Sequence, residues 1–183
     1  MRLFIALNFD EKTKESILAA QKRLRAYGKG RFSPKENFHL TLAFIGEASK
    51  DDLPAIVKAM ESVEFPSLEP EFDRTGFFAR DGEIWWIGLK EDPALMKLQK
   101  DLVKALKAEG IRTDAKRFRP HITLARDMHI GDKAVRESIL PEPFRTRVDR
   151  ISLMNSNYPA KEVRYTELRS VCAKEGKNDQ SRV

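Results

Sequence analysis

Two of the three histidines in this sequence lie in a pattern that could support acid–base chemistry. The segments HLTLA and HITLA begin at His39 and His121, and each places a threonine two residues after its histidine. Because residues two apart on a strand share a face, His39 and Thr41 should point together, as should His121 and Thr123. One such motif is commonly an ordinary strand surface, but its repetition favours a functional pair.

The four side chains together suit the cleavage of a phosphodiester. Imidazoles have an ordinary pKa of about 6.5, so near neutral pH one can accept a proton from water while the other donates a proton to a leaving oxygen. Threonine hydroxyls can hydrogen-bond the non-bridging oxygens of the phosphate. A ribose hydroxyl as leaving group fits this set. A zinc site would need a third ligand, so we predict neither a metal nor another cofactor.

The spacing of the two motifs extends to their surroundings and indicates a duplication. Positions 82 residues apart match in type, since Asp10 corresponds to Asp92, Leu24 to Leu106 and Gly28 to Gly110, ahead of His39 and His121. In both copies an apolar strand precedes the aspartate, which is a favoured helix N-cap, and glycine is a common helix stop. We predict one bilobal domain over residues 1–173, built from two repeats of about 1–80 and 81–173, followed by a disordered polar tail at 174–183.

The expected elements define an α+β fold. We expect a first strand up to Phe9, a helix from Asp10 to about Tyr27, and a second helix capped by Ser49. Further strands are predicted at 71–79, 144–153 and 163–172. The predicted architecture has two mainly antiparallel sheets that face a central cleft, with helices on the outer faces and a pseudo-twofold axis between the halves.

Composition indicates a cytoplasmic protein with no membrane contact. The chain has 183 residues, of which 41% are hydrophobic and 34% charged, and no apolar run is long enough to span a bilayer. Its single cysteine, Cys172, is expected in the core and fits a reducing compartment. We expect a monomer. The net charge of +6 favours polyanionic partners such as RNA.

The two motifs and their flanks resemble a known signature. HLTL and HITL, with MRLFIAL, HLTLAFIGE, IWWIGL and RPHITLAR, are similar to the two-histidine (2H) phosphoesterases, and within them to the LigT-like RNA 2′,3′-cyclic phosphodiesterases, also called 2′–5′ RNA ligases. The resemblance reaches to about Ala173. It implies hydrolysis of a 2′,3′-cyclic phosphate to a 2′-phosphomonoester, or the reverse type of reaction, 2′–5′ ligation.

The resemblance also implies roles for the four side chains. His39 would be the proton donor and His121 the proton acceptor that activates water, while Thr41 and Thr123 would hold the phosphate. The chemistry of the residues alone does not distinguish the two histidines. The third histidine, His129, has no matching threonine and is expected at the surface.

Two further residues would bind the substrate in such a protein. Phe44 and Arg126 stand five positions after the two histidines and resemble a clamp on the nucleobase. Strict alternation would put both on the opposite face from the histidines, so they reach the cleft only near a strand end or a bulge. For Phe44 a plain core position is equally open.

The predicted partners are RNA ends that carry a 2′,3′-cyclic phosphate, tRNA halves among them, or cyclic nucleotides. One alternative is a phosphodiesterase for 2′–5′ oligonucleotides or small cyclic nucleotides, and another is a non-catalytic RNA- or nucleotide-binding module. Of Trp85 and Trp86, one should face inward and one outward; core packing is the default for both, and ligand contact is open to the outward one. Basic residues before the two motifs could line RNA or form solvated loops: Lys29, Arg31, Lys116, Arg117 and Arg119.

Overall fold

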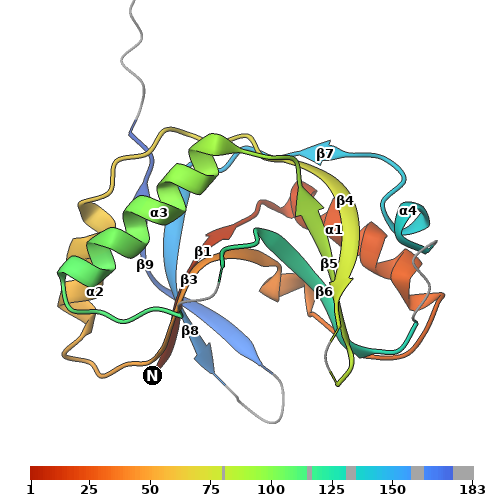
Figure 1. Ribbon diagram of the computed structural model, residues 1–183, viewed down its shortest axis with the longest axis horizontal. Helices are drawn as coiled ribbons and strands as arrows, with labels where there is room; N and C mark the ends of the chain where they lie inside the picture. The colour runs from red at the N-terminus through yellow and green to blue at the C-terminus, as the bar shows by residue number, and fades with distance from the viewer. Residues whose placement is uncertain (80, 115–116, 131–134, 158–162, 175–183) are drawn as a thin grey trace, which may run out of the picture.

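The computed structural model of the protein describes residues 1–79, 81–114, 117–130, 135–157 and 163–174 (Figure 1). Within them, nine strands form one antiparallel sheet in the order β7-β4-β5-β6-β3-β1-β8-β9, with β2 paired to β6. The strands are β1 (Arg2–Asn8), β2 (Arg31–Phe32), β3 (His39–Glu47), β4 (Glu71–Phe78), β5 (Glu83–Leu89), β6 (His121–Met128), β7 (Phe144–Arg145), β8 (Arg150–Asn157) and β9 (Arg164–Cys172).

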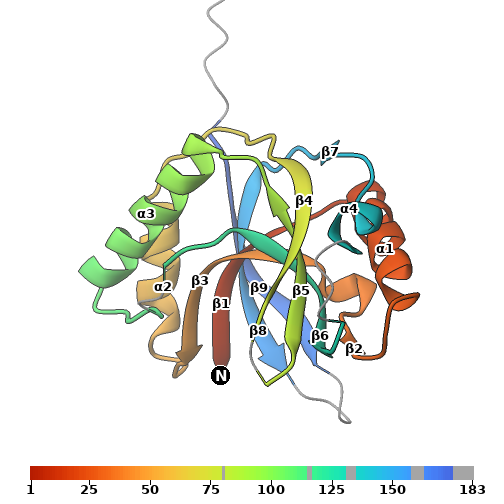
Figure 2. The same ribbon diagram turned by 45° about the vertical axis from the view of Figure 1, so that its right-hand side comes forward.

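The helices lie on the outer flanks of the sheet. Figure 2 shows α2 and α3 together on one flank and α1 and α4 on the other. The helices are α1 (Glu11–Arg25), α2 (Leu53–Glu61), α3 (Pro93–Ala108) and α4 (Val135–Ile139), with a short 3₁₀ turn, η1, at Lys35–Asn37. This arrangement confirms the predicted α+β fold with outward-facing helices.

The predicted caps explain where the two long helices begin. The Asp10 carboxylate accepts a hydrogen bond from the Thr13 backbone N–H at 2.7 Å, and Asp92 accepts one from Leu95 at 2.9 Å. Gly110 follows α3 with φ 78°. Gly28 is predicted to stop α1 in a left-handed conformation, and this is wrong: Gly28 does not have a positive φ, and α1 already ends at Arg25.

Two other predicted elements need correction. The N-cap of α2 is Asp52 rather than Ser49, and the helix begins at Leu53. Ser49 forms reciprocal hydrogen bonds with Asp52 just before the helix, since its N–H donates to the Asp52 carboxylate at 2.7 Å and its hydroxyl accepts from the Asp52 N–H at 3.3 Å. The strand predicted at 144–153 is two strands at different places in the sheet. β7 pairs with β4, whereas β8 pairs with β1 and β9, and a single bridge between Leu68 and Val148 lies between them.

The two halves exchange elements. In the first half, β4 pairs with β5 of the second half, and in the second half, β8 pairs with β1 of the first half. Likewise α1 packs beside β6 and α3 beside β3. Each half therefore supports the histidine strand of the other.

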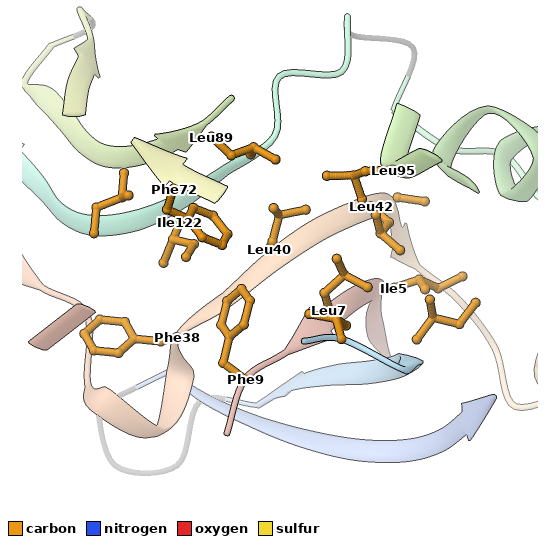
Figure 3. Close-up of a cluster of buried hydrophobic side chains, with 14 of the residues drawn as sticks. Ile5, Leu7, Phe9, Phe38, Leu40, Leu42, Phe72, Leu89, Leu95 and Ile122 are labelled. Atoms are coloured by element: carbon orange, nitrogen blue, oxygen red, sulfur yellow. The ribbon is translucent and has the colours of Figure 1, made fainter. Parts of the chain in front are cut away.

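The two predicted sheets join where β3 meets β6. Leu40 pairs there with Ile122 in antiparallel register, and both side chains are fully buried. Figure 3 shows them in one apolar cluster with Ile5 and Leu7 of β1. Because adjacent strand residues face opposite ways, burial of Leu40 and Ile122 turns His39 and His121 to the other face of the sheet.

The end of the chain is described up to Lys174. The predicted tail begins at this residue, but its backbone N–H donates to the Phe65 carbonyl at 3.0 Å. The rest of the predicted disordered tail, 175–183, lies outside the described residues.

Candidate active site

All six predicted site residues line one cavity of about 340 Å³ on the face of the sheet opposite the Leu40–Ile122 core. They come from the two central strands: His39, Thr41 and Phe44 from β3, and His121, Thr123 and Arg126 from β6. The cavity size is that of a small-molecule or nucleotide pocket.

A bulge in β3 brings Phe44 to the side of the histidine. Against β1, Ala43 pairs with Ile5 and Thr41 with Ala6, which leaves Leu42 as an extra residue. Leu42 and Ala43 are therefore both buried, and the alternation of side chains shifts by one residue.

The same irregularity occurs in β6. Against β5, Ala125 pairs with Trp85 and Thr123 with Trp86, so Leu124 is the extra residue. It brings Arg126 to the cavity face. Both strands thus contain the bulge that the prediction requires. Phe44, for which a core position was equally open, lines the cavity.

Both imidazole rings are held by the backbone just before their strand. The Nδ1 atom of His39 hydrogen-bonds the Asn37 carbonyl at 2.6 Å, and Nδ1 of His121 bonds the Arg119 carbonyl at 2.6 Å. Since a carbonyl oxygen only accepts, Nδ1 is the donor in each ring and Nε2 carries the lone pair when the ring is neutral. Nε2 of His39 lies 3.0 Å from the Thr41 hydroxyl.

Aromatic side chains pack around both rings, and apart from Trp86 the sequence analysis did not consider them for the site. His39 lies 4.9 Å from Phe4 and 5.0 Å from Tyr165, between ring centroids, and the Tyr165 contact is edge-on. His121 lies 5.1 Å from Phe78, also edge-on, and 6.4 Å from Trp86. Phe4 and Trp86 are 82 residues apart, so the same repeat that related the histidines could have identified both.

Burial lowers the pKa of both histidines. The pKa of His39 falls to about 4, first because burial penalises the charged ring, and further because His121 and Arg126 add positive charge; the Asn37 carbonyl opposes this. The pKa of His121 is lowered by burial and by Arg126, against the Arg119 carbonyl. At neutral pH both rings are therefore neutral.

Three arginines give the cavity a positive charge. Arg2 and Arg31 line it together with Arg126, and Arg31 forms an ion pair with Asp127. Guanidinium groups suit a phosphate ligand, because each can donate two hydrogen bonds to the phosphate oxygens. Over the described ranges, no three His, Cys, Asp or Glu side chains form a cluster that could hold a metal ion.

Other sequence predictions concern residues outside the cavity. His129 is exposed, as expected for a surface residue. Trp85 is fully buried and Trp86 half-buried, which confirms one inward and one outward ring. Cys172 is exposed rather than in the core, because β9 is an edge strand with most of its side chains in solvent.

Comparison with known proteins places this architecture in a family. Residues 13–158 match the model of the 2′-5′ RNA ligase superfamily. The chain belongs to this superfamily. An Archaeoglobus fulgidus protein named RNA 2′,3′-cyclic phosphodiesterase is 33% identical over 128 residues, which are 69% of this chain and 72% of the relative. A Thermotoga maritima protein of the same name is 31% identical, over 85% of this chain and 87% of its own.

Solved structures show the same fold. Escherichia coli LigT without ligand superposes with a TM-score of 0.81 at 26% identity, covering 94% of this chain and 96% of LigT. LigT has also been solved in complex with 3′-AMP, and that structure gives a TM-score of 0.80. In the described part of this chain, no helix is both long and apolar enough to cross a membrane.

Proposed function

We propose that this protein is an RNA 2′,3′-cyclic phosphodiesterase that opens the cyclic phosphate to a 2′-phosphomonoester. The observation that carries the proposal is that two imidazoles, each held by a backbone carbonyl, share one cavity with two threonine hydroxyls and three arginines. The names of the two relatives and the 3′-AMP complex of LigT support the choice of an RNA end as substrate.

In the proposed reaction, Nε2 of His121 takes a proton from a water molecule that attacks phosphorus. The bond from phosphorus to the 3′ oxygen breaks, and His39 donates a proton to that oxygen. We assign the water-activating role to His121 by its likeness to the superfamily, because both imidazoles are half-buried and are held by the backbone in the same way. After turnover His121 holds the proton and His39 has lost one, so exchange with solvent restores the starting state.

The negative charge of the bound substrate favours the protonated form of His39 that the reaction needs. Without substrate, the pKa of His39 is too low for the ring to be charged at neutral pH. A bound phosphate would raise this pKa, because its negative charge favours the imidazolium. Thr41, Thr123 and Arg126 would hold the non-bridging oxygens, whose charge shifts during in-line transfer. Phe44 would stack on the terminal base, with the Arg126 guanidinium within reach of the same base.

The remaining expectations about the biology are part of the same proposal. The protein would act as a cytoplasmic monomer without a metal or other cofactor, and tRNA halves are one candidate source of cyclic ends. The 2′–5′ ligation reaction is the reverse type, and small cyclic nucleotides or 2′–5′ oligonucleotides are the alternative substrates. A binding module would not need two proton-transfer groups held in this way.

The test is turnover of a short RNA with a 2′,3′-cyclic end in EDTA, with the terminal phosphate of the product located by NMR. We expect a 2′-phosphate from the wild type and from His129→Ala, and a rate lower by about 10²-fold or more in His39→Ala and in His121→Ala. Binding of the RNA by the wild type without ring opening would instead support the binding module. Turnover retained in both histidine variants would refute the proposed chemistry.

A further inference from the structure

A second cavity, of about 400 Å³, adjoins the first across His121. His121 lines both cavities, and the second continues over β4, β5 and the segment before β6. Nothing in the proposed reaction uses this cavity. It is lined by aromatic and arginine side chains, chiefly Phe78, Trp86, Arg74, Arg117 and Arg119.

The floor of this cavity is an indole ring that lies flat on the sheet. A Cβ atom added to Gly76 would come within 2.5 Å of Trp86, and one added to Gly88 would come within 2.8 Å. Because no side chain stands at these two positions, one face of the ring can rest on the backbone of β4 and β5. Phe78 lies beside the ring, 5.3 Å away between centroids.

The corresponding place in the other half is built differently and belongs to the first cavity, which Phe4 and Tyr165 line. Position 4, 82 residues before Trp86, holds Phe4, and Ala6 stands where the second half has Gly88. Phe4 is buried against Tyr165, with ring centroids 4.9 Å apart. The halves therefore differ: on the His121 side a larger ring lies against two glycines and lines a cavity of its own.

The rim of the second cavity is cationic. Arg74 is fixed by the Leu89 carbonyl and by an ion pair with Asp73, Arg119 lies 5.9 Å from the Phe78 ring centroid, and Arg117 is exposed. None of the described residues that line this cavity is acidic. Aromatic rings with arginines and no carboxylate form the combination that binds single-stranded nucleic acid through base stacking and phosphate contacts.

We propose that this cavity binds the nucleotide that precedes the cyclic end of the RNA. The inference rests on the proposed function and narrows its substrate to an oligonucleotide. With the cyclic phosphate between the histidines and the terminal base at Phe44, the 5′ oxygen is the terminal nucleotide's only link to the rest of the chain. That chain passes His121, stacks its next base on Trp86 and Phe78, and sets a phosphate against Arg117 and Arg119.

The test compares a 2′,3′-cyclic mononucleotide with a trinucleotide that carries the same cyclic end. We expect the wild type to have the higher kcat/KM on the trinucleotide. Arg117→Gln should lower that value roughly tenfold and leave mononucleotide turnover unchanged. It should also reduce the slope of affinity against salt by about one. The matched control is Arg23→Gln, which removes the same charge from an exposed position on α1.

Equal kcat/KM for the two substrates, or an equal loss on both in Arg117→Gln, would overturn the inference. If the wild type hydrolysed neither substrate, the proposed function would fail, and calorimetric titration would still decide the second cavity. The ligands would be a nucleoside 3′-phosphate and a trinucleotide ending in a 3′-phosphate. Tighter binding of the trinucleotide, lost in Arg117→Gln, supports the cavity as a nucleotide site; equal affinities in wild type and variant reject it.

Discussion

Gln21 and Gln99 reach the two bulges of the active-site strands from the helices beneath them. Nε2 of Gln21, in α1, donates to the Leu124 carbonyl at 2.9 Å, and Nε2 of Gln99, in α3, donates to the Leu42 carbonyl at 3.3 Å. A bulge disrupts the regular ladder, and other donors supplement it; the Leu124 carbonyl, for example, also accepts from the Ser33 backbone N–H at 2.9 Å. The exchanged helices thus hold the irregularities that turn Arg126 and Phe44 into the cavity.

The Gln21 contact should matter for stability. Gln21 is buried and also donates to the Ser33 carbonyl at 2.8 Å. Gln21→Leu keeps a similar volume but removes both donors, and we expect the free energy of unfolding to fall by about 2 kcal/mol. Urea denaturation measures it.

Gln99→Leu is the internal comparison for this prediction. Gln99 is half-buried and its hydrogen bond is longer, so its loss should cost less than that of Gln21. We also expect Gln21→Leu to raise KM more than it lowers kcat, because Arg126 loses its support. Equal stability of Gln21→Leu and wild type would show that the helix does not hold the bulge.

The difference between what the sequence predicted and what it missed follows from the range of the interactions. The sequence predicted the features that can be recognised without knowing which distant residues are in contact. These are the histidine motifs, the helix caps at Asp10 and Asp92, and the similarity of positions 82 residues apart. The bulges left a trace as consecutive apolar residues in both strands, Leu42 with Ala43 and Leu124 with Ala125. Because the same apolar pair occurs at matching positions of both repeats, it could have predicted that Phe44 and Arg126 lie on the histidine face.

The exchange of elements between the halves left no such local trace. Which helix packs beside β6, and which strand pairs with β1, depends on contacts between distant residues. The predicted strand 144–153 failed for the same reason. Its apolar residues serve different neighbours, since Phe144 pairs with Phe72 in β4 while Ile151 pairs with Val171 in β9. No periodicity distinguishes one buried strand from two.

Acid should destabilise the protein through His39. Its pKa is about 4 in the folded chain and about 6.5 when unfolded, so between these values the unfolded state binds more protons. The stability is complete above pH 6.5 and is lost as the pH falls toward 4, by about 1–2 kcal/mol at pH 5. Denaturation at pH 7.5 and 5 should show a smaller loss in His39→Gln than in wild type. His129→Gln, at an exposed position, should behave as wild type.

The pH dependence of turnover should be bell-shaped and displaced toward acid. The profile of kcat/KM reports the pKa values of the free enzyme, and both histidines have theirs lowered, so its maximum should lie below pH 6.5. The profile of kcat reports the complex, in which the phosphate raises both values. We therefore expect the maximum of kcat at a higher pH than that of kcat/KM. Coincident maxima would contradict substrate-assisted protonation.

Arg126 should influence both binding and the position of that maximum. Its charge contributes to the lowered pKa of each histidine, so Arg126→Gln should move the maximum of kcat/KM to a higher pH while KM rises. Arg23→Gln, on the exposed side of α1, should change neither quantity. A rise in KM with an unmoved pH profile would restrict Arg126 to substrate contact.

Thr123 offers the cleanest test of phosphate stabilisation. Its hydroxyl lines the cavity, whereas that of Thr41 also contacts His39, so a change at Thr123 disturbs the imidazoles less. Thr123→Val keeps the shape and removes the donor, and we expect kcat to fall about 100-fold with little change in KM, since the hydrogen bond is needed most in the transition state. Thr123→Ser, which retains the hydroxyl, should recover most of the loss, and Thr166→Val on the exposed edge strand should lose nothing. Steady-state kinetics on the cyclic RNA measures the three variants. If Thr123→Ser were as slow as Thr123→Val, the reaction would require the packing of the methyl group and not the hydroxyl.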